Sequence, residues 1–167
     1  MVYVTWRSGA GKSTLLRLVA LIDRHTHGQV IVNGQNPDRV KDRRSPLYRR
    51  NIGFTFQDHR LLDDRSIFDN VTLPLMVSGY RYQEISKRVR ASLDKVGLLN
   101  KEKQLPLQPS GGGQQCVGIA RAAVHRPALV LVDEPTGNLG PALSMEIMRL
   151  FKQFNQVGVT VLIVRHD

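Results

Sequence analysis

The chain has 167 residues, enough for one domain with a hydrophobic core, and its 41% hydrophobic and 23% charged residues are ordinary for a globular protein. No apolar run is long enough to span a bilayer, and a single cysteine, Cys116, excludes an internal disulfide framework and fits a reducing cytoplasm. The formal net charge of +10 favours an anionic partner: a nucleotide, a nucleic acid or a lipid surface.

The first third of the chain predicts short strands, one helix and a basic stretch. We expect a buried strand over residues 2–5, a helix over 12–23, and a strand over 29–32 that ends in an Asn33-Gly34 turn. Residues 37–50 are polar and basic, which indicates a loop and a short helix. A further strand is expected over residues 52–56.

The rest of the chain predicts longer helices and two buried strands. Residues 61–79 are mixed, whereas 83–96 have helical apolar spacing. A loop over 106–113 is followed by a helix to about His125, which Ser110 is expected to cap. Residues 128–132 and 159–164 are expected to be buried strands, and 142–155 an amphipathic helix between them.

This alternation of strands and helices predicts an α/β fold, with a mostly parallel sheet flanked by helices on both faces. The helical stretch over residues 58–105 interrupts the alternation. We interpret it as a helical subdomain inserted into an α/β core formed by 1–57 and 106–167. The whole chain, 1–167, is then one domain.

A glycine-rich loop between the first strand and the first helix predicts a phosphate site of the P-loop kind. The loop residues are Ser8, Gly9, Ala10, Gly11, Lys12, Ser13 and Thr14. Glycines let backbone N–H groups point at phosphate, and the helix N-terminus adds positive potential. Lys12 would reach the β- and γ-phosphates and the Ser13 hydroxyl would bind Mg²⁺. Trp6 occupies the position of the first glycine in the full pattern, where a Cβ is unfavourable.

Two adjacent carboxylates follow the apolar run 129–132. Ligands of doubly wound folds bind at the carboxyl ends of strands, so Asp133 and Glu134 would lie at such a site. Asp133 would hold Mg²⁺, and Glu134 would polarise the water that attacks the γ-phosphate. Solvated acids at a strand end are common, and only the P-loop upstream makes this pattern specific.

A third motif, Ser110-Gly111-Gly112-Gly113-Gln114, opens the helix after residue 110. The order of the motifs along the chain resembles that of the ABC ATPases. The P-loop comes first, then Gln57 after a strand, this Ser-Gly-Gly segment, Asp133-Glu134-Pro135-Thr136, and finally His166 after a strand. The resemblance covers nearly the whole chain. It implies a P-loop NTPase core that binds and hydrolyses ATP with Mg²⁺.

The resemblance also implies roles for single residues. Glu134, His166 and Gln57 would be catalytic, and Ser13, Gln57 and Asp133 would surround Mg²⁺. In this family two subunits form a head-to-tail dimer. Ser110, Gly111, Gly112 and Gln114 would therefore contact the γ-phosphate bound to the partner, at a helix N-terminus suited to anions.

Within this family the chain looks most like the ATP-binding subunits of the cell-division (FtsE) type. This likeness is carried by residues 56–62, 64–71, 93–99, 149–151 and 154–161. It implies a peripheral protein at the cytoplasmic face of the bacterial inner membrane, with a polytopic membrane subunit of the FtsX type as partner. The ATPases of lipoprotein-releasing and macrolide exporters share much of the pattern and remain the alternative.

Several positions depart from the family pattern. Trp6 replaces glycine, Pro109 replaces leucine, and Gly113 and Cys116 replace polar or charged residues. Gly140 replaces the aspartate of the loop after Gly137. Arg165 precedes His166, at a position where the family often has a small or polar residue. Measured against the family, we expect the chain to be truncated at both ends. Dimerisation and turnover are the properties that these departures would impair, and a remnant that does not hydrolyse ATP is a second alternative.

Basic residues gather at 39–50 and 81–103, and no aromatic stacking platform is interleaved with them, so nucleic-acid binding is not expected. A solvated basic face is the simplest interpretation, followed by contact with anionic lipid beside the membrane partner. Residues 73–76 would line a groove for that partner or belong to the core. The histidines lack metal-ligand spacing, and Cys116 is expected to serve packing.

Overall fold

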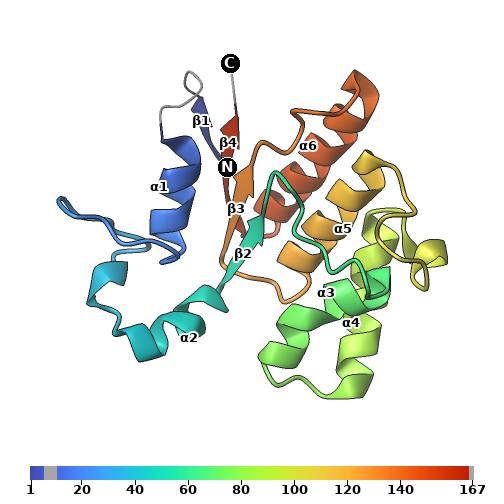
Figure 1. The fold of residues 1–167 in the computed structure, drawn as a ribbon, viewed down its shortest axis with the longest axis horizontal. Helices are drawn as coiled ribbons and strands as arrows, with labels where there is room; N and C mark the ends of the chain where they lie inside the picture. The colour runs from blue at the N-terminus through green and yellow to red at the C-terminus, as the bar shows by residue number, and fades with distance from the viewer. Residues whose placement is uncertain (6–10, 166–167) are drawn as a thin grey trace.

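The computed structural model of the chain describes residues 1–5 and 11–165, which contain four strands and six α-helices (Figure 1). The strands are β1 (Val2–Thr5), β2 (Ile52–Thr55), β3 (Leu129–Asp133) and β4 (Thr160–Arg165). The helices are α1 (Lys12–Val19), α2 (Ser45–Arg49), α3 (Ile67–Val77), α4 (Tyr82–Lys95), α5 (Gly111–Ala123) and α6 (Pro141–Gln156). None of them combines the length and apolarity needed to cross a bilayer.

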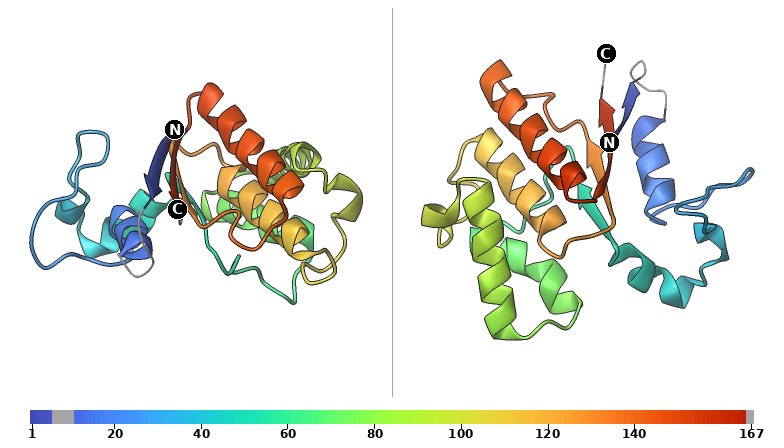
Figure 2. Two further views of the ribbon diagram at one scale, coloured as in Figure 1. Left: turned by 90° about the horizontal axis from the view of Figure 1, so that it is seen from above. Right: turned by 180° about the vertical axis from the view of Figure 1, so that it is seen from behind.

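The four strands form one parallel sheet in the order β1-β4-β3-β2. Side chains alternate along β3, so that Leu129 and Leu131 pack with α1 on one face while Val130 and Val132 pack with α5 and α6 on the other. Figure 2 shows the sheet between these two layers. The predicted fold class, a parallel sheet covered by helices on both faces, is confirmed.

A second cluster of buried side chains joins α3, α4 and α5 at the side of the sheet. Its members are Ile67, Val71, Leu75, Ile85, Val89, Leu93, Leu98, Cys116, Val117, Ala120 and Val124. Cys116 is a buried member of this cluster, as its packing role requires. Ile119, on the same helix, belongs to the layer against the sheet. Helix α5 therefore contributes to both cores, and the division at residues 58 and 105 stays a prediction.

Helix α3 was missed in the prediction of a mixed segment over residues 61–79. Its start is capped, because Ser66 Oγ accepts a hydrogen bond from the Asp69 N–H at 3.0 Å. Asn70 is fully buried and exchanges hydrogen bonds with the Leu62 backbone at 2.8 and 3.0 Å. Buried polar residues and Pro74 interrupt the apolar pattern, so the spacing of apolar residues does not predict this helix.

Two predictions in the first third of the chain were wrong. The helix expected over 12–23 ends at Val19, because Leu21 adopts φ 53° and cannot continue it. The strand expected over 29–32 is absent. Only an isolated antiparallel bridge between Val32 and Gln35 forms there, across the predicted turn at Asn33 and Gly34.

Strand β1 was predicted in the correct place but not with the correct environment. Among the described strands it lies at the sheet edge, and Val2 and Tyr3 are 52% and 46% exposed. The loop expected over 106–113 was also too long, because α5 begins at Gly111.

A close approach of α5 to β2 depends on Gly53. A Cβ at this position would lie 2.2 Å from the backbone oxygen of Ala122, which is closer than any real contact. Glycine thus lets helix and strand touch, and this contact positions the loop that follows β2.

Candidate functional site

The carboxyl ends of all four strands meet at one edge of the sheet. Thr5 is paired with Arg165, Asp133 with Val164, and Thr55 with Val132. The glycine-rich loop, the two carboxylates and the segment of Gln57 all follow these strand ends. The register therefore brings the predicted motifs to the edge where ligands of such sheets bind.

Helix α1 begins at this edge directly after Gly11, which has φ 80°, a conformation that favours glycine. Lys12 is the first helical residue and is buried, whereas Ser13 and Thr14 are exposed. The remaining predicted loop residues Ser8, Gly9 and Ala10, together with Trp6, lie outside the described residues. A buried ammonium at a helix N-terminus makes this end of α1 strongly electropositive.

Asp133 ends β3 with its side chain 8% exposed. Its Oδ1 is buried and accepts no hydrogen bond within residues 1–5 and 11–165. A buried carboxylate oxygen without a donor is costly unless a cation or proton satisfies it. This atom is the best evidence in the structure for a cation at the edge.

Glu134 follows in a left-handed backbone conformation, φ 48°, and its N–H donates to the Val164 oxygen at 2.9 Å. Non-glycine residues with positive φ cluster at functional sites. The turn that begins at Glu134 directs the chain away from the sheet toward α6.

The donor set fits magnesium better than a softer metal. The described residues contain no group of three or more His, Cys, Asp or Glu side chains that would hold a metal alone. Mg²⁺ prefers oxygen ligands and keeps several waters, so one carboxylate with a hydroxyl and an amide is a suitable protein share. Asp133, Ser13 and Gln57 offer these groups.

Gln57 is exposed, in the turn that follows β2. Two and three residues further along the chain, His59 and Arg60 have φ 58° and 44°. Their carbonyl oxygens accept hydrogen bonds from Arg121 Nη2 at 2.7 Å and Nη1 at 2.8 Å. Arg121 thus anchors the segment of Gln57 to α5.

Sequence reasoning missed this anchor. The available signal was one arginine inside the apolar run of α5, since a charge there needs partners. Burial lowers the pKa of Arg121, and the guanidinium still remains charged. Burial also lowers the pKa of His59, opposed by a hydrogen bond with Gln115.

Residues 110–114, which we call the signature segment, lie on the other face of the sheet from α1, at the start of α5 (Figure 1). Ser110 is the N-cap residue, as predicted, but its side chain makes no capping hydrogen bond. Gly112 is buried against Leu143 of α6, and the Gln114 N–H donates to the Ser110 oxygen at 3.0 Å. The structure does not bring this segment to Lys12 of the same chain.

Two departures from the family pattern are neighbours in space. A Cβ on Gly113 would lie 2.4 Å from Cβ of Pro109. The small residue at 113 therefore accommodates the proline at 109. Gly140 is the N-cap residue of α6, where it supplies no side-chain cap. His166 lies outside the described residues.

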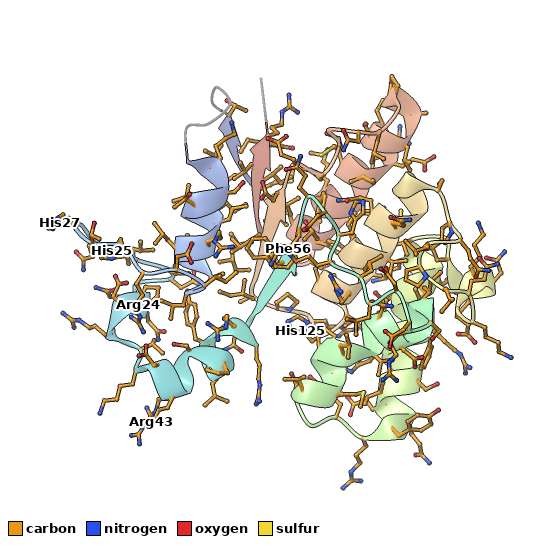
Figure 3. The ribbon with its side chains drawn as sticks, viewed as in Figure 1. Arg24, His25, His27, Arg43, Phe56 and His125 are labelled. Carbon is orange, nitrogen blue, oxygen red and sulfur yellow. The ribbon has the colours of Figure 1, made fainter. Side chains whose placement is uncertain are left out.

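A cavity of about 470 Å³ opens between α2, β2, α3 and the end of α5. It is lined by Pro46, Arg49, Arg50, Ile52, Gly53, Phe54, Phe56, Arg60, Leu73, Pro74, Val77, Ser78, Arg121, Ala122 and His125. We call it the α2–α3 groove. Figure 3 places Phe56 and His125 beside it. Of the predicted segment 73–76, Leu73 and Pro74 line the groove, whereas Leu75 is buried core.

Comparison with known proteins decides the family. Residues 1–137 match the family model described as ABC transporter. The chain belongs to the ABC transporter family. As an ABC-type ATPase it aligns over its full length, at 55% identity, with 75% of the cell division ATP-binding protein FtsE of Escherichia coli. The FtsE protein of Bacillus subtilis is 43% identical, with 99% of this chain and 73% of that protein covered.

Solved ABC cassettes share the fold. The dimeric structure of the bacterial ABC transporter cassette MJ0796 superimposes with a TM-score of 0.91 at 36% identity, covering all of this chain and 75% of that one. A post-hydrolysis dimer of the same cassette, bound to ADP and Pi, gives a TM-score of 0.91 at 34% identity with the same coverage. CbiO1 of Clostridium perfringens, part of the transporter complex cbiONQ, gives 0.87 at 28% identity, covering 99% and 66%.

Proposed function

We propose that this ABC-type ATPase is the ATP-hydrolysing subunit of a membrane complex that acts in bacterial cell division. The buried Oδ1 of Asp133, without a donor in the described part of the chain and at the edge where Lys12 begins α1, is the observation that carries the site. The identity with FtsE proteins supports the biological role.

At this site the glycine-rich loop and the first residues of α1 hold the phosphates of ATP. These residues are Ser8, Gly9, Ala10, Gly11, Lys12, Ser13 and Thr14. Ser13, Gln57 and Asp133 hold Mg²⁺, which neutralises phosphate charge when bound. Glu134 takes a proton from the attacking water, and His166 contacts the γ-phosphate.

A head-to-tail dimer completes the site. Ser110, Gly111, Gly112 and Gln114 begin α5 on the far face from α1, so in one chain they do not reach the phosphates. A second copy supplies them instead, at a helix N-terminus that attracts anions. The dimeric structure of MJ0796 supports this arrangement.

The membrane partner, a polytopic subunit of the FtsX type, docks in the α2–α3 groove at the cytoplasmic face of the inner membrane. The α2–α3 groove is lined by apolar residues and by the basic residues Arg49 and Arg50, so it suits an amphipathic segment that carries acidic residues. Residues 58–105 form the helical subdomain that carries motion from the ATP site to this groove, and the core is 1–57 and 106–167.

The deciding experiment is binding of ATP with Mg²⁺ to the purified chain by calorimetry, compared with Lys12→Ala. We expect saturable binding that the substitution abolishes, because Lys12 supplies the buried charge at the phosphate site. Lys87→Ala, a change of an exposed lysine on α4, is the matched control and should bind normally. Absence of binding by a folded wild-type chain would sink the proposal.

A second candidate, a form that binds ATP without hydrolysing it, is favoured by Pro109, Gly113 and Gly140 at positions that serve the dimer in the family. Phosphate release at saturating ATP separates the two: turnover supports the first and its absence, with binding intact, the second.

A further inference from the structure

Residues 34–44, which we call the basic arm, enclose a second cavity on the side of the molecule that carries α2. Its volume is about 530 Å³, and four of its lining side chains are cationic: Arg39, Lys41, Arg43 and Arg44. The amide residues Gln35 and Asn36 line it too, and no acidic residue does.

The two acidic residues of the basic arm contact side chains that lie outside it. Arg24 Nη2 contacts Asp42 Oδ1 at 2.7 Å, and Nε2 of His25 contacts Asp38 Oδ2 at 2.5 Å. Arg24 also donates to the Asp38 and Val40 backbone oxygens at 3.1 and 2.9 Å, which ties the arm to the segment after α1.

The four lining cations, by contrast, form no ion pair and no side-chain hydrogen bond with the residues that the structure describes. Like charges this close in sequence repel one another within a Debye length. Phosphate oxygens relieve that repulsion, and guanidinium groups bind them in a two-point geometry. Arg43 projects outward from the arm in Figure 3.

Position favours a lipid source for the phosphate. Arg44 lines this cavity and Pro46 lines the α2–α3 groove, so the two sites adjoin through α2. Ile31 and Leu47, on either side of the arm in sequence, are 61% and 53% exposed. Exposed apolar residues flanking basic ones are typical of surfaces that lie on anionic bilayers.

We propose that the basic arm binds phosphodiester headgroups of an anionic membrane through Arg39, Lys41, Arg43 and Arg44. This inference rests on the proposed function for the neighbouring groove, and it assigns the lipid contact to one site. The arm holds the ATPase against the bilayer beside its membrane partner.

The test is sedimentation of the intact chain with phosphatidylcholine vesicles that contain or lack phosphatidylglycerol, without nucleotide. The variant Arg39→Gln/Arg43→Gln/Arg44→Gln is compared with Lys101→Gln/Arg149→Gln/Lys152→Gln. Both remove three positive charges, and the control residues are exposed on other elements. Circular dichroism verifies that both variants fold.

We expect binding only to the anionic vesicles, weakened about 100-fold in the arm variant, at about fivefold for each cation lost. The control variant should bind like the wild type. Equal losses in both variants, or no binding by the wild type, would overturn the proposal, because the arm would then have no special role.

Two competition experiments distinguish the source of the phosphate. In the first, inorganic pyrophosphate replaces the vesicles as the probe. If pyrophosphate binds through the arm and vesicles do not, the arm is a site for soluble phosphate and the lipid assignment is overturned. Duplex DNA bound through the arm more tightly than the vesicles would overturn it as well. Because nucleotide is absent, failure of ATP binding leaves this result intact, and the two proposals fail separately.

Discussion

Glu134 adopts a left-handed backbone conformation directly after a regular strand. It follows a fully buried strand, adopts φ 48°, and is held there by the hydrogen bond from its N–H to the Val164 oxygen. A non-glycine residue in this conformation costs of order 1–3 kcal/mol, which the paired strands on either side make tolerable. The conformation lies directly after the end of β3, where we propose that Glu134 acts as the general base for water.

Removing the charge of this carboxylate should stop turnover without preventing binding. For Glu134→Gln we expect phosphate release to fall about 100- to 10,000-fold, because a general base contributes that range. Affinity for ATP should remain close to that of the wild type. Glu146→Gln, on the exposed surface of α6, serves as the control. A rate unchanged by Glu134→Gln would assign the base to another residue.

At the scale of elements, Arg121 joins α5 to the segment that follows β2. Helix α5 begins at the signature segment, and the anchored carbonyls lie two and three residues after Gln57. We predict that a movement of α5 would reach Gln57 through these two charge-assisted hydrogen bonds.

Shortening Arg121 should release this connection. We expect Arg121→Ala to lower stability by about 2–3 kcal/mol, since hydrogen bonds to charged groups contribute about 1.5–3 kcal/mol. The turnover number of the folded fraction should fall too, and Arg121→Lys should restore stability better than turnover, since an ammonium cannot hold both carbonyls in the same fork. Denaturant unfolding and steady-state kinetics measure the two effects. Normal turnover in folded Arg121→Ala would reduce Arg121 to a purely structural role.

The contact between Pro109 and Gly113 gives a second prediction for this helix. Gly113→Ala should raise helix propensity by about 1 kcal/mol, yet we expect net destabilisation of about 1–2 kcal/mol because the new Cβ meets Pro109. In the background Pro109→Gly the same change should stabilise. A double-mutant cycle of unfolding free energies measures this coupling, and additive effects would contradict it.

The elements that sequence alone predicted well are those with one dominant signal. Leu129 to Val132 form an uninterrupted apolar run, and α6 carries a clear amphipathic pattern through Ile147 and Phe151. The apolar run also predicted that Asp133 ends a strand, and it is the last residue of β3. The Arg121 anchor and the contact of Pro109 with Gly113 depend on tertiary distances that no spacing encodes. Helix α3 is stabilised by the Ser66 cap and by the hydrogen bonds of the buried Asn70, which a search for apolar periodicity does not detect.

At the scale of the whole molecule, two partly buried histidines make stability depend on pH. Burial lowers the pKa of both His59 and His125 from an ordinary value of 6.5. The unfolded chain therefore binds more protons than the folded chain as pH falls below about 6.5, so stability is complete above that pH and is lost toward the lower folded-state pKa.

We expect the melting temperature to fall between pH 7.5 and 5.5 in the wild type. His125→Gln should reduce this slope, whereas His27→Gln, which changes an exposed side chain, should leave it unaltered. Scanning calorimetry at several pH values makes the comparison. An identical slope in His125→Gln would mean that other groups cause the dependence.

Helix α5 lies between two cores, with Ile119 against the sheet and Val117 among the helices α3 and α4. Loss of either core would leave one face of this helix without its packing partners, so we expect the two halves of the molecule to unfold in one cooperative transition. Its central amides should be among the slowest in the chain to exchange with deuterium.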